Sequence, residues 1–124
     1  MNICIIGTGY VGLVTGSCLA DSGNDVTCLD IDKNKIESLK NGEVGIYEPG
    51  LEEIVTRNYK EGRLSFTTNY REAIKKSKII FLAVSTPPKE DGSADLSYIL
   101  SASKELAKNI NGYKVIVTKS TVPV

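Results

Sequence analysis

The sequence contains no histidine, and its few cysteines do not stand in a metal-binding pattern. Histidine is the commonest general base and metal ligand in proteins, so its absence disfavours both roles. The three cysteines, Cys4, Cys18 and Cys28, lack C-x-x-C spacing and lie within apolar strand or helix patterns. We therefore expect no metal site, and we expect all three thiols to be buried in a protein of a reducing compartment.

The sequence also lacks an excess of charge and a long apolar run. Its 15 lysine and arginine residues are matched by 15 aspartate and glutamate residues, so no net charge attracts it to nucleic acid or anionic lipid. No apolar run approaches the roughly 20 residues that span a bilayer, and the N-terminus has no signal-peptide pattern. We expect a cytoplasmic protein that binds neither nucleic acid nor membrane.

The most informative pattern lies at the N-terminus, where the apolar residues 2–6 lead into a G-x-G-x-x-G motif at residues 7–12. This motif is typical of a dinucleotide-binding site when it connects a strand to a helix, as the flanking patterns indicate here. Gly7 permits the tight turn, Gly9 lets a pyrophosphate approach the backbone, and Gly12 lets the helix pack closely. The motif therefore predicts a dinucleotide cofactor.

The residues after the glycines indicate how the cofactor is held and which cofactor it is. A helix that begins near Tyr10 points its free N–H groups at the phosphates, so we expect the Val11 amide to contact them while its side chain packs. A second apolar run, residues 26–29, ends at Asp30. This carboxylate can accept hydrogen bonds from ribose hydroxyls and would repel a 2′-phosphate, which favours NAD over NADP. The alternative is a glycine-rich turn that binds no nucleotide.

Strand and helix patterns alternate along the whole chain. They predict strands over residues 2–6, 26–30, 64–68, 79–84 and 113–118, and helices over residues 10–22, 32–40, 51–59, 70–76 and 96–110. This alternation requires a mostly parallel sheet with helices on both faces, and right-handed crossovers favour the strand order 3-2-1-4-5. At 124 residues, the sequence predicts one Rossmann-type, doubly wound α/β domain.

Two local expectations follow from these patterns. In the first helix, Val11, Val14 and Cys18, together with the small Gly16 and Ala20, are expected to form the face that packs against the sheet. Ligands of such sheets bind beyond the carboxyl ends of the strands, so we expect residues 7–12, 85–87 and 119–121 to meet at one crevice.

Five segments resemble the UDP-glucose 6-dehydrogenase family, in order and over the whole chain. They are residues 7–13, 28–32, 46–51, 86–88 and 119–124. The resemblance implies that Asp30 and Lys35 hold the adenosine ribose and that Thr86 and Thr121 line the cofactor towards its nicotinamide end. Together with the motif, it implies the cofactor-binding set Gly7, Gly9, Tyr10, Val11, Gly12, Asp30, Lys35, Thr86 and Thr121. Lys35 could instead be solvated, and either threonine could instead satisfy local backbone groups.

The resemblance also implies an activity and a division of labour. The family oxidises UDP-glucose to UDP-glucuronate in two NAD-dependent steps that use an active-site cysteine in a later part of a longer chain. We therefore expect residues 1–124 to be the NAD-binding domain, without the central and C-terminal substrate domains. It should bind NAD without turnover, and UDP-glucose only with those domains. Thr121 is the one auxiliary candidate for catalysis, and residues 47–50 have no expected role beyond a rigid turn.

Other readings remain open at this point. The same domain occurs by resemblance in dehydrogenases of GDP-mannose or a UDP-N-acetyl-hexosamine, whose cofactor motifs are shared. The chain could also be a stand-alone nucleotide-binding module. A fifth strand at the end of the sheet would expose unpaired backbone groups, so we expect homo-oligomers.

Overall fold

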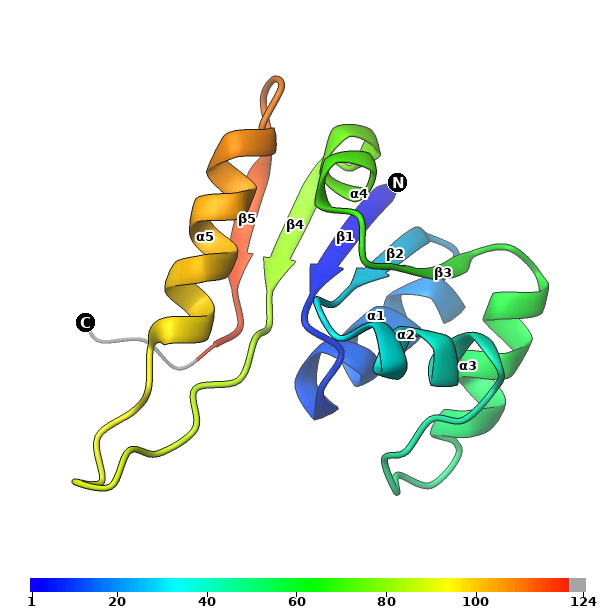
Figure 1. The fold of residues 1–124 in the computed structure, drawn as a ribbon. Coiled ribbons are helices and arrows are strands. Elements are labelled where there is room, and N and C mark those ends of the chain that lie inside the picture. The colour runs from blue at the N-terminus through cyan, green and yellow to red at the C-terminus, as the bar shows by residue number, and fades with distance from the viewer. Residues whose placement is uncertain (121–124) are drawn as a thin grey trace.

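The alternating pattern produces a five-stranded sheet with helices on both faces, as seen in a computed structural model that describes residues 1–120 (Figure 1). The strands are β1 (Asn2–Ile6), β2 (Asp25–Leu29), β3 (Leu64–Thr67), β4 (Ile79–Leu82) and β5 (Val115–Thr118). Every neighbouring pair is parallel, and the strand order is β3-β2-β1-β4-β5. The predicted fold class and strand order are confirmed.

Five helices connect these strands: α1 (Tyr10–Asp21), α2 (Lys33–Lys40), α3 (Leu51–Lys60), α4 (Tyr70–Lys76) and α5 (Ser97–Asn109). Helix α2 begins where the Asp32 carboxylate accepts hydrogen bonds from the backbone N–H groups of Asn34 and Lys35, and Asn69 caps α4 in the same way. The Asp95 carboxylate accepts a bond from the Ser97 N–H at 2.9 Å, although Leu96 is the capping position of α5.

The strands separate two hydrophobic cores. Along β1, Ile3 and Ile5 point to the face covered by α1, α2 and α3, whereas Cys4 and Ile6 point to the face covered by α4 and α5 (Figure 1). Successive side chains of a strand alternate between faces, so an unbroken apolar run serves both cores. This double burial places β1 at the centre of the sheet, with its carboxyl end next to the glycine motif.

Helix α1 turns only part of its predicted face to the sheet: Gly16 and Ala20 are buried as predicted, and Val14 packs partly buried against the core. Its buried residues are Gly12, Leu13, Gly16, Ser17 and Ala20. The Val11 side chain is 42% exposed and Cys18 is exposed, so the predictions that Val11 packs and that Cys18 is buried are wrong. The reason is close approach: a Cβ at Gly16 would lie 2.9 Å from the Cys28 sulfur, so only the small-residue face fits against β2.

The other two thiols are buried as predicted. Cys4 and Cys28 have no measurable exposed surface. Burial raises the pKa of the Cys4 thiol to about 12 and raises the pKa of Cys28 as well. Both residues therefore stay protonated at neutral pH and act as small apolar side chains of the cores.

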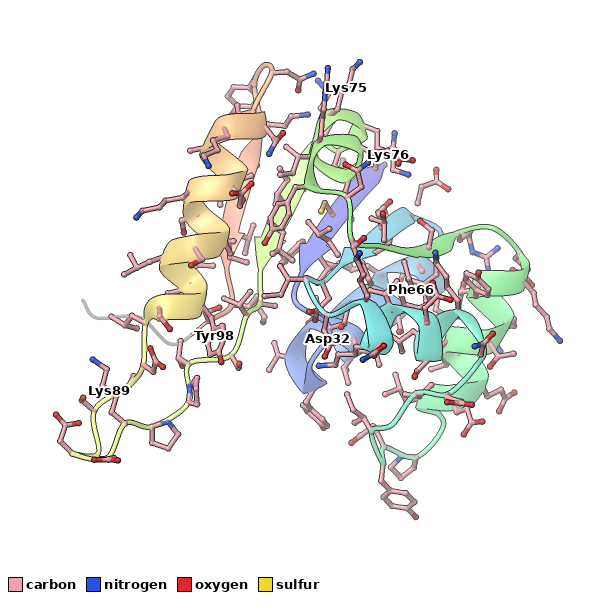
Figure 2. The ribbon with its side chains drawn as sticks, viewed as in Figure 1. Asp32, Phe66, Lys75, Lys76, Lys89 and Tyr98 are labelled. Atoms are coloured by element: carbon pink, nitrogen blue, oxygen red, sulfur yellow. The ribbon has the colours of Figure 1, made fainter. Side chains whose placement is uncertain are left out.

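The connection between β4 and α5 extends away from the sheet. Figure 2 shows Lys89 near the far end of this segment. Its two arms are joined by an antiparallel bridge between Pro88 and Ala94, and the Lys89 N–H donates to the Ser93 carbonyl at 2.6 Å. Over residues 1–120, no helix has the length and apolar character needed to cross a membrane.

A Gly12→Ala substitution tests the close packing of α1. The added Cβ would overlap the carbonyl oxygen of Gly7, whereas a Cβ at Gly9 would meet no atom within 4 Å. We expect Gly12→Ala to lower the free energy of unfolding by about 3 kcal/mol or more, and the control Gly9→Ala to lower it by less than about 1 kcal/mol. Urea unfolding followed by circular dichroism measures both, and equal losses would contradict the packing argument.

Candidate functional site

The glycine motif forms a tight turn between β1 and α1 that lies against two other segments. Gly7 has a φ of +108°, which L side chains rarely adopt, and a Cβ there would lie 2.5 Å from the Ala83 carbonyl oxygen. The Gly7 N–H donates to the Leu29 carbonyl at 2.7 Å. Gly7 is therefore required both by the turn and by the segment after β4.

The start of α1 leaves space and free donors for an anion. Gly9 is the capping residue of α1, and no side chain caps the helix there. Because nothing lies within 4 Å of the Cβ position of Gly9, the backbone is open on that side. The N–H groups of the first turn, including those of Tyr10 and Val11, have no partner within the helix, and its dipole places positive charge at this end. This arrangement fits a pyrophosphate.

Asp30 lies directly beside the glycine motif, at the carboxyl end of β2. Its Oδ2 accepts hydrogen bonds from the Thr8 N–H at 2.9 Å and the Thr8 hydroxyl at 2.6 Å, and its Oδ1 accepts one from the Asp32 N–H at 3.1 Å. Burial raises the pKa of Asp30, but these hydrogen bonds and the charge of Lys35 together hold it below its ordinary value. Asp30 is therefore an ionised acceptor at neutral pH.

The structure gives the positions of two of the remaining predicted residues, Lys35 and Thr86, but not that of the third. Lys35 is exposed in the first turn of α2, near enough for its charge to act on Asp30. Thr86 is partly exposed in the segment after β4. Thr121 lies outside the described residues.

The turn before Thr121 is bound to the segment after β4. The Ser120 hydroxyl donates to the Val84 carbonyl at 2.8 Å, and the Lys119 N–H donates to the Leu82 carbonyl at 2.8 Å. Because Gly7 contacts Ala83 in the same segment, the carboxyl ends of β1, β4 and β5 are linked. Gly7 and residues 119–120 therefore meet the chain at residues 82–84, directly before the predicted segment 85–87, at the carboxyl ends of the strands.

Sequence reasoning missed a contact between the glycine motif and the loop before α3. The Tyr10 hydroxyl donates to Glu48 Oε2 at 2.8 Å, and this bond to the carboxylate raises the pKa of Tyr10. Gly50 then caps α3 with a φ of +81°, which agrees with the expected rigid turn. The Tyr10 phenol thus holds the loop, while its backbone N–H remains at the positive end of α1. Only the family resemblance of residues 46–51 marked this loop beforehand.

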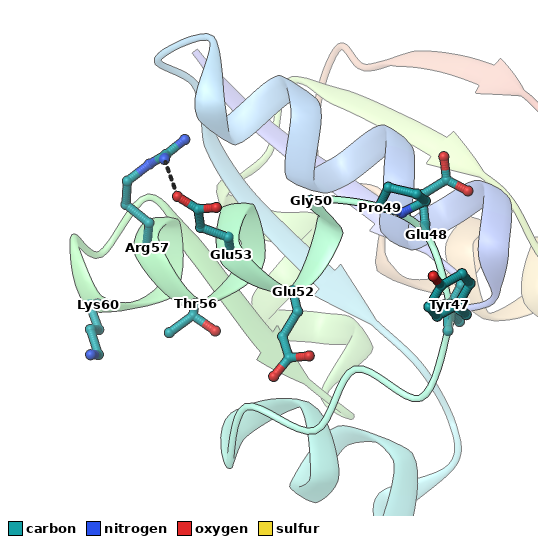
Figure 3. A pocket seen from close by; sticks show the side chains of 10 residues that line it. Tyr47, Glu48, Pro49, Gly50, Glu52, Glu53, Thr56, Arg57 and Lys60 are labelled. Carbon is teal, nitrogen blue, oxygen red and sulfur yellow. Dashed lines mark ion pairs between the residues drawn. The ribbon is translucent and has the colours of Figure 1, made fainter.

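A separate open groove of about 820 Å³ lies between this loop and α3 (Figure 3). Its lining includes Glu52, Glu53, Arg57 and Lys60, and the Arg57 guanidinium lies 4.0 Å from the Glu53 carboxylate. It contains none of the predicted cofactor-binding residues. The part of the chain that the structure describes also holds no group of three or more histidine, cysteine, aspartate or glutamate residues that could bind a metal ion.

Comparison with known proteins decides the family. A model described as the NAD binding domain of the UDP-glucose/GDP-mannose dehydrogenase family matches residues 1–124. The chain belongs to this family. It is 56% identical over 123 residues to UDP-glucose 6-dehydrogenase TuaD of Bacillus subtilis and 52% identical over 125 residues to UDP-glucose 6-dehydrogenase of Rhizobium meliloti. These matches cover 99% and 100% of this chain but only 27% and 29% of those relatives.

Solved structures agree on the fold. A ternary complex of GDP-mannose dehydrogenase from Pseudomonas aeruginosa superposes with a TM-score of 0.92 at 37% identity, over 98% of this chain and 29% of that one. A UDP-glucose dehydrogenase from Pyrobaculum islandicum has a TM-score of 0.91 at 40% identity, over 98% and 29%. The chain is thus an NAD-binding domain that spans less than a third of these relatives, which confirms the predicted cofactor and resemblance.

An Asp30→Ala substitution tests the predicted role of Asp30 in nucleotide binding. Removing the carboxylate would delete the acceptor that the sequence predicts for the ribose hydroxyls and the charge predicted to repel a 2′-phosphate. We expect NAD affinity to fall about tenfold and the preference for NAD over NADP to shrink. Calorimetric titrations with both nucleotides measure this. The matched control is Asp25→Ala, at the opposite end of β2; unchanged affinity of Asp30→Ala for both nucleotides would remove Asp30 from the site.

Proposed function

We propose that residues 1–124 are the cofactor domain of an NAD-dependent UDP-glucose 6-dehydrogenase, which oxidises UDP-glucose to UDP-glucuronate with two NAD. The observation that carries this proposal is the juxtaposition of an open Gly9 backbone, an uncapped helix start and the ionised Asp30. They occur in a chain 56% identical to a UDP-glucose 6-dehydrogenase. Central and C-terminal substrate domains, of the kind that would account for the greater length of the relatives, would complete the enzyme.

We assign each residue of the proposed site a task from the family resemblance, and for residues 9–12, Asp30 and Lys35 the structure supports it. The backbone of residues 9–12 holds the pyrophosphate, and Asp30 and Lys35 hold the adenosine ribose. Thr86 and Thr121 line the nicotinamide end, with Thr121 as the auxiliary to catalysis. Bound NAD supplies the hydride acceptor. By the family resemblance, the nucleophilic cysteine would come from a later domain. The thiols of Cys4 and Cys28 are buried and protonated, which makes them unsuited to that role.

The identity of the sugar is supported by the relatives. Curated proteins named UDP-glucose 6-dehydrogenase are 44–56% identical to this chain. Among the solved structures, a UDP-glucose dehydrogenase is 40% identical, and the GDP-mannose and UDP-N-acetyl-mannosamine dehydrogenases are 31–37% identical. Those sugars remain the alternative substrates, and a stand-alone nucleotide-binding module remains the alternative from another class. A reading frame that continues beyond Val124 into a cysteine-containing domain would exclude the module.

Binding and turnover of the purified chain test the proposal. We expect calorimetry to detect NAD binding by residues 1–124, because the cofactor groups lie within them. We expect no NADH absorbance when UDP-glucose and NAD are mixed with the chain alone, because the substrate pocket belongs to other domains. A folded sample that releases no heat with NAD, or one that reduces NAD with UDP-glucose by itself, would overturn it.

We also propose association through β5 and a cytoplasmic location. Strand β5 ends the sheet order, and its Val115 and Ile116 are exposed. The free thiols of Cys4, Cys18 and Cys28 support a reducing compartment. A strand edge with exposed apolar residues favours pairing with another strand, so we expect dimers or larger species at high concentration. Light scattering over a concentration series measures this, and a monodisperse monomer throughout would contradict it.

A further inference from the structure

Thr8 occupies one of the unspecified positions of the glycine motif, yet its side chain is buried and directed at Asp30. It is 1% exposed. Both its N–H, at 2.9 Å, and its hydroxyl, at 2.6 Å, donate to the same oxygen, Oδ2 of Asp30. The two residues are 22 positions apart in the sequence. A buried hydroxyl that only needed a partner could use a nearby backbone carbonyl, whereas this one reaches across to the next strand.

These bonds determine which part of the Asp30 carboxylate is left for a ligand. An ionised carboxylate offers about four lone-pair positions, two on each oxygen. Thr8 fills both positions on Oδ2, and the Asp32 N–H, at 3.1 Å, fills one on Oδ1. One position on Oδ1 therefore remains, and its direction is fixed because the carboxylate is held from both sides. A ribose hydroxyl can donate to that position, while a 2′-phosphate would bring negative charge against it.

The other charged and titratable groups around Asp30 do not replace this contact. Lys35 of α2 acts on Asp30 through its charge alone. Tyr70 of α4 is close enough for the charge of Asp30 to contribute to the raised pKa of the phenol, after burial and Glu105. Asp32 contributes its backbone N–H. Among the side chains, the Thr8 hydroxyl is the largest influence that keeps Asp30 ionised.

We propose that Thr8 is a positioning and specificity residue: its hydroxyl orients the Asp30 carboxylate towards the adenosine ribose of NAD and thereby strengthens discrimination against NADP. This inference rests on the proposed NAD binding. It assigns a task to a side chain that the glycine motif leaves unspecified. Thr8 acts through Asp30 and needs no contact with the cofactor.

Matched substitutions separate this role from a packing role. Thr8→Val keeps the branched shape and the backbone N–H but removes the hydroxyl, and Thr8→Ser restores the hydroxyl. Thr8→Ala is a second variant without the hydroxyl, for use if the valine is not accommodated. Thr27→Val is the control. Thr27, on β2, is buried like Thr8, but its hydroxyl accepts from the Ser65 hydroxyl at 3.3 Å and makes no bond to Asp30.

Two measurements are made on each folded variant. The first follows the Asp30 carboxyl carbon by NMR during an acid titration without nucleotide. Because the hydroxyl favours the ionised carboxylate, its removal should move the titration to higher pH in Thr8→Val and leave it unchanged in Thr8→Ser and Thr27→Val. The second is calorimetry with NAD and NADP. We expect Thr8→Val to weaken NAD binding about 3- to 10-fold and NADP binding less, with recovery in Thr8→Ser.

The outcomes distinguish this inference from the proposed function. If the unmodified chain binds no NAD, the proposed function fails, and the carboxyl titration still decides whether Thr8 controls Asp30. If the unmodified chain binds NAD but Thr8→Val keeps the same titration or the same preference between the nucleotides, the inference about Thr8 is wrong. An equal loss in Thr27→Val would also overturn it, since that result would indicate a general effect of buried hydroxyl loss.

Discussion

The close approach of backbone to backbone around the glycine motif is the constraint on which the site depends. A side chain at Gly7 would meet the segment after β4, one at Gly12 would meet Gly7 itself, and one at Gly16 would meet β2. These contacts set how near α1 lies to the sheet. They also set where the positive end of α1 points relative to Asp30. The geometry of the proposed cofactor site is therefore a consequence of packing that the protein needs in order to fold.

The elements and their order could be predicted from the sequence because both follow from local patterns. Apolar runs that end in polar turns mark strands, and the parallel alternation allows few topologies. The packing face of α1 could be predicted only in part. Gly16 and Ala20 are buried as expected, but Val11 and Cys18, which were predicted on the same face, are exposed. The rotation of the helix depends on how closely it approaches β2, which is a tertiary property.

The residues of the candidate site also differ in how far the sequence predicts them. The residues proposed to contact the cofactor through their backbone or position, such as Gly9 and Asp30, were recognisable from spacing. The contacts of Thr8 with Asp30 and of Tyr10 with Glu48 were not, because the partners are 22 and 38 positions apart and no periodicity links them. Side-chain hydrogen bonds between distant loops depend on how the strands end, which only the assembled sheet determines.

The glycines of the motif are required for different reasons. Gly7 and Gly12 are held by the fold, since any side chain there collides with backbone, but the Cβ position of Gly9 faces empty space. A side chain at Gly9 would therefore cost the fold little, and its main effect would fall on the proposed cofactor site. A well-folded member of this family is thus no evidence of an intact cofactor site.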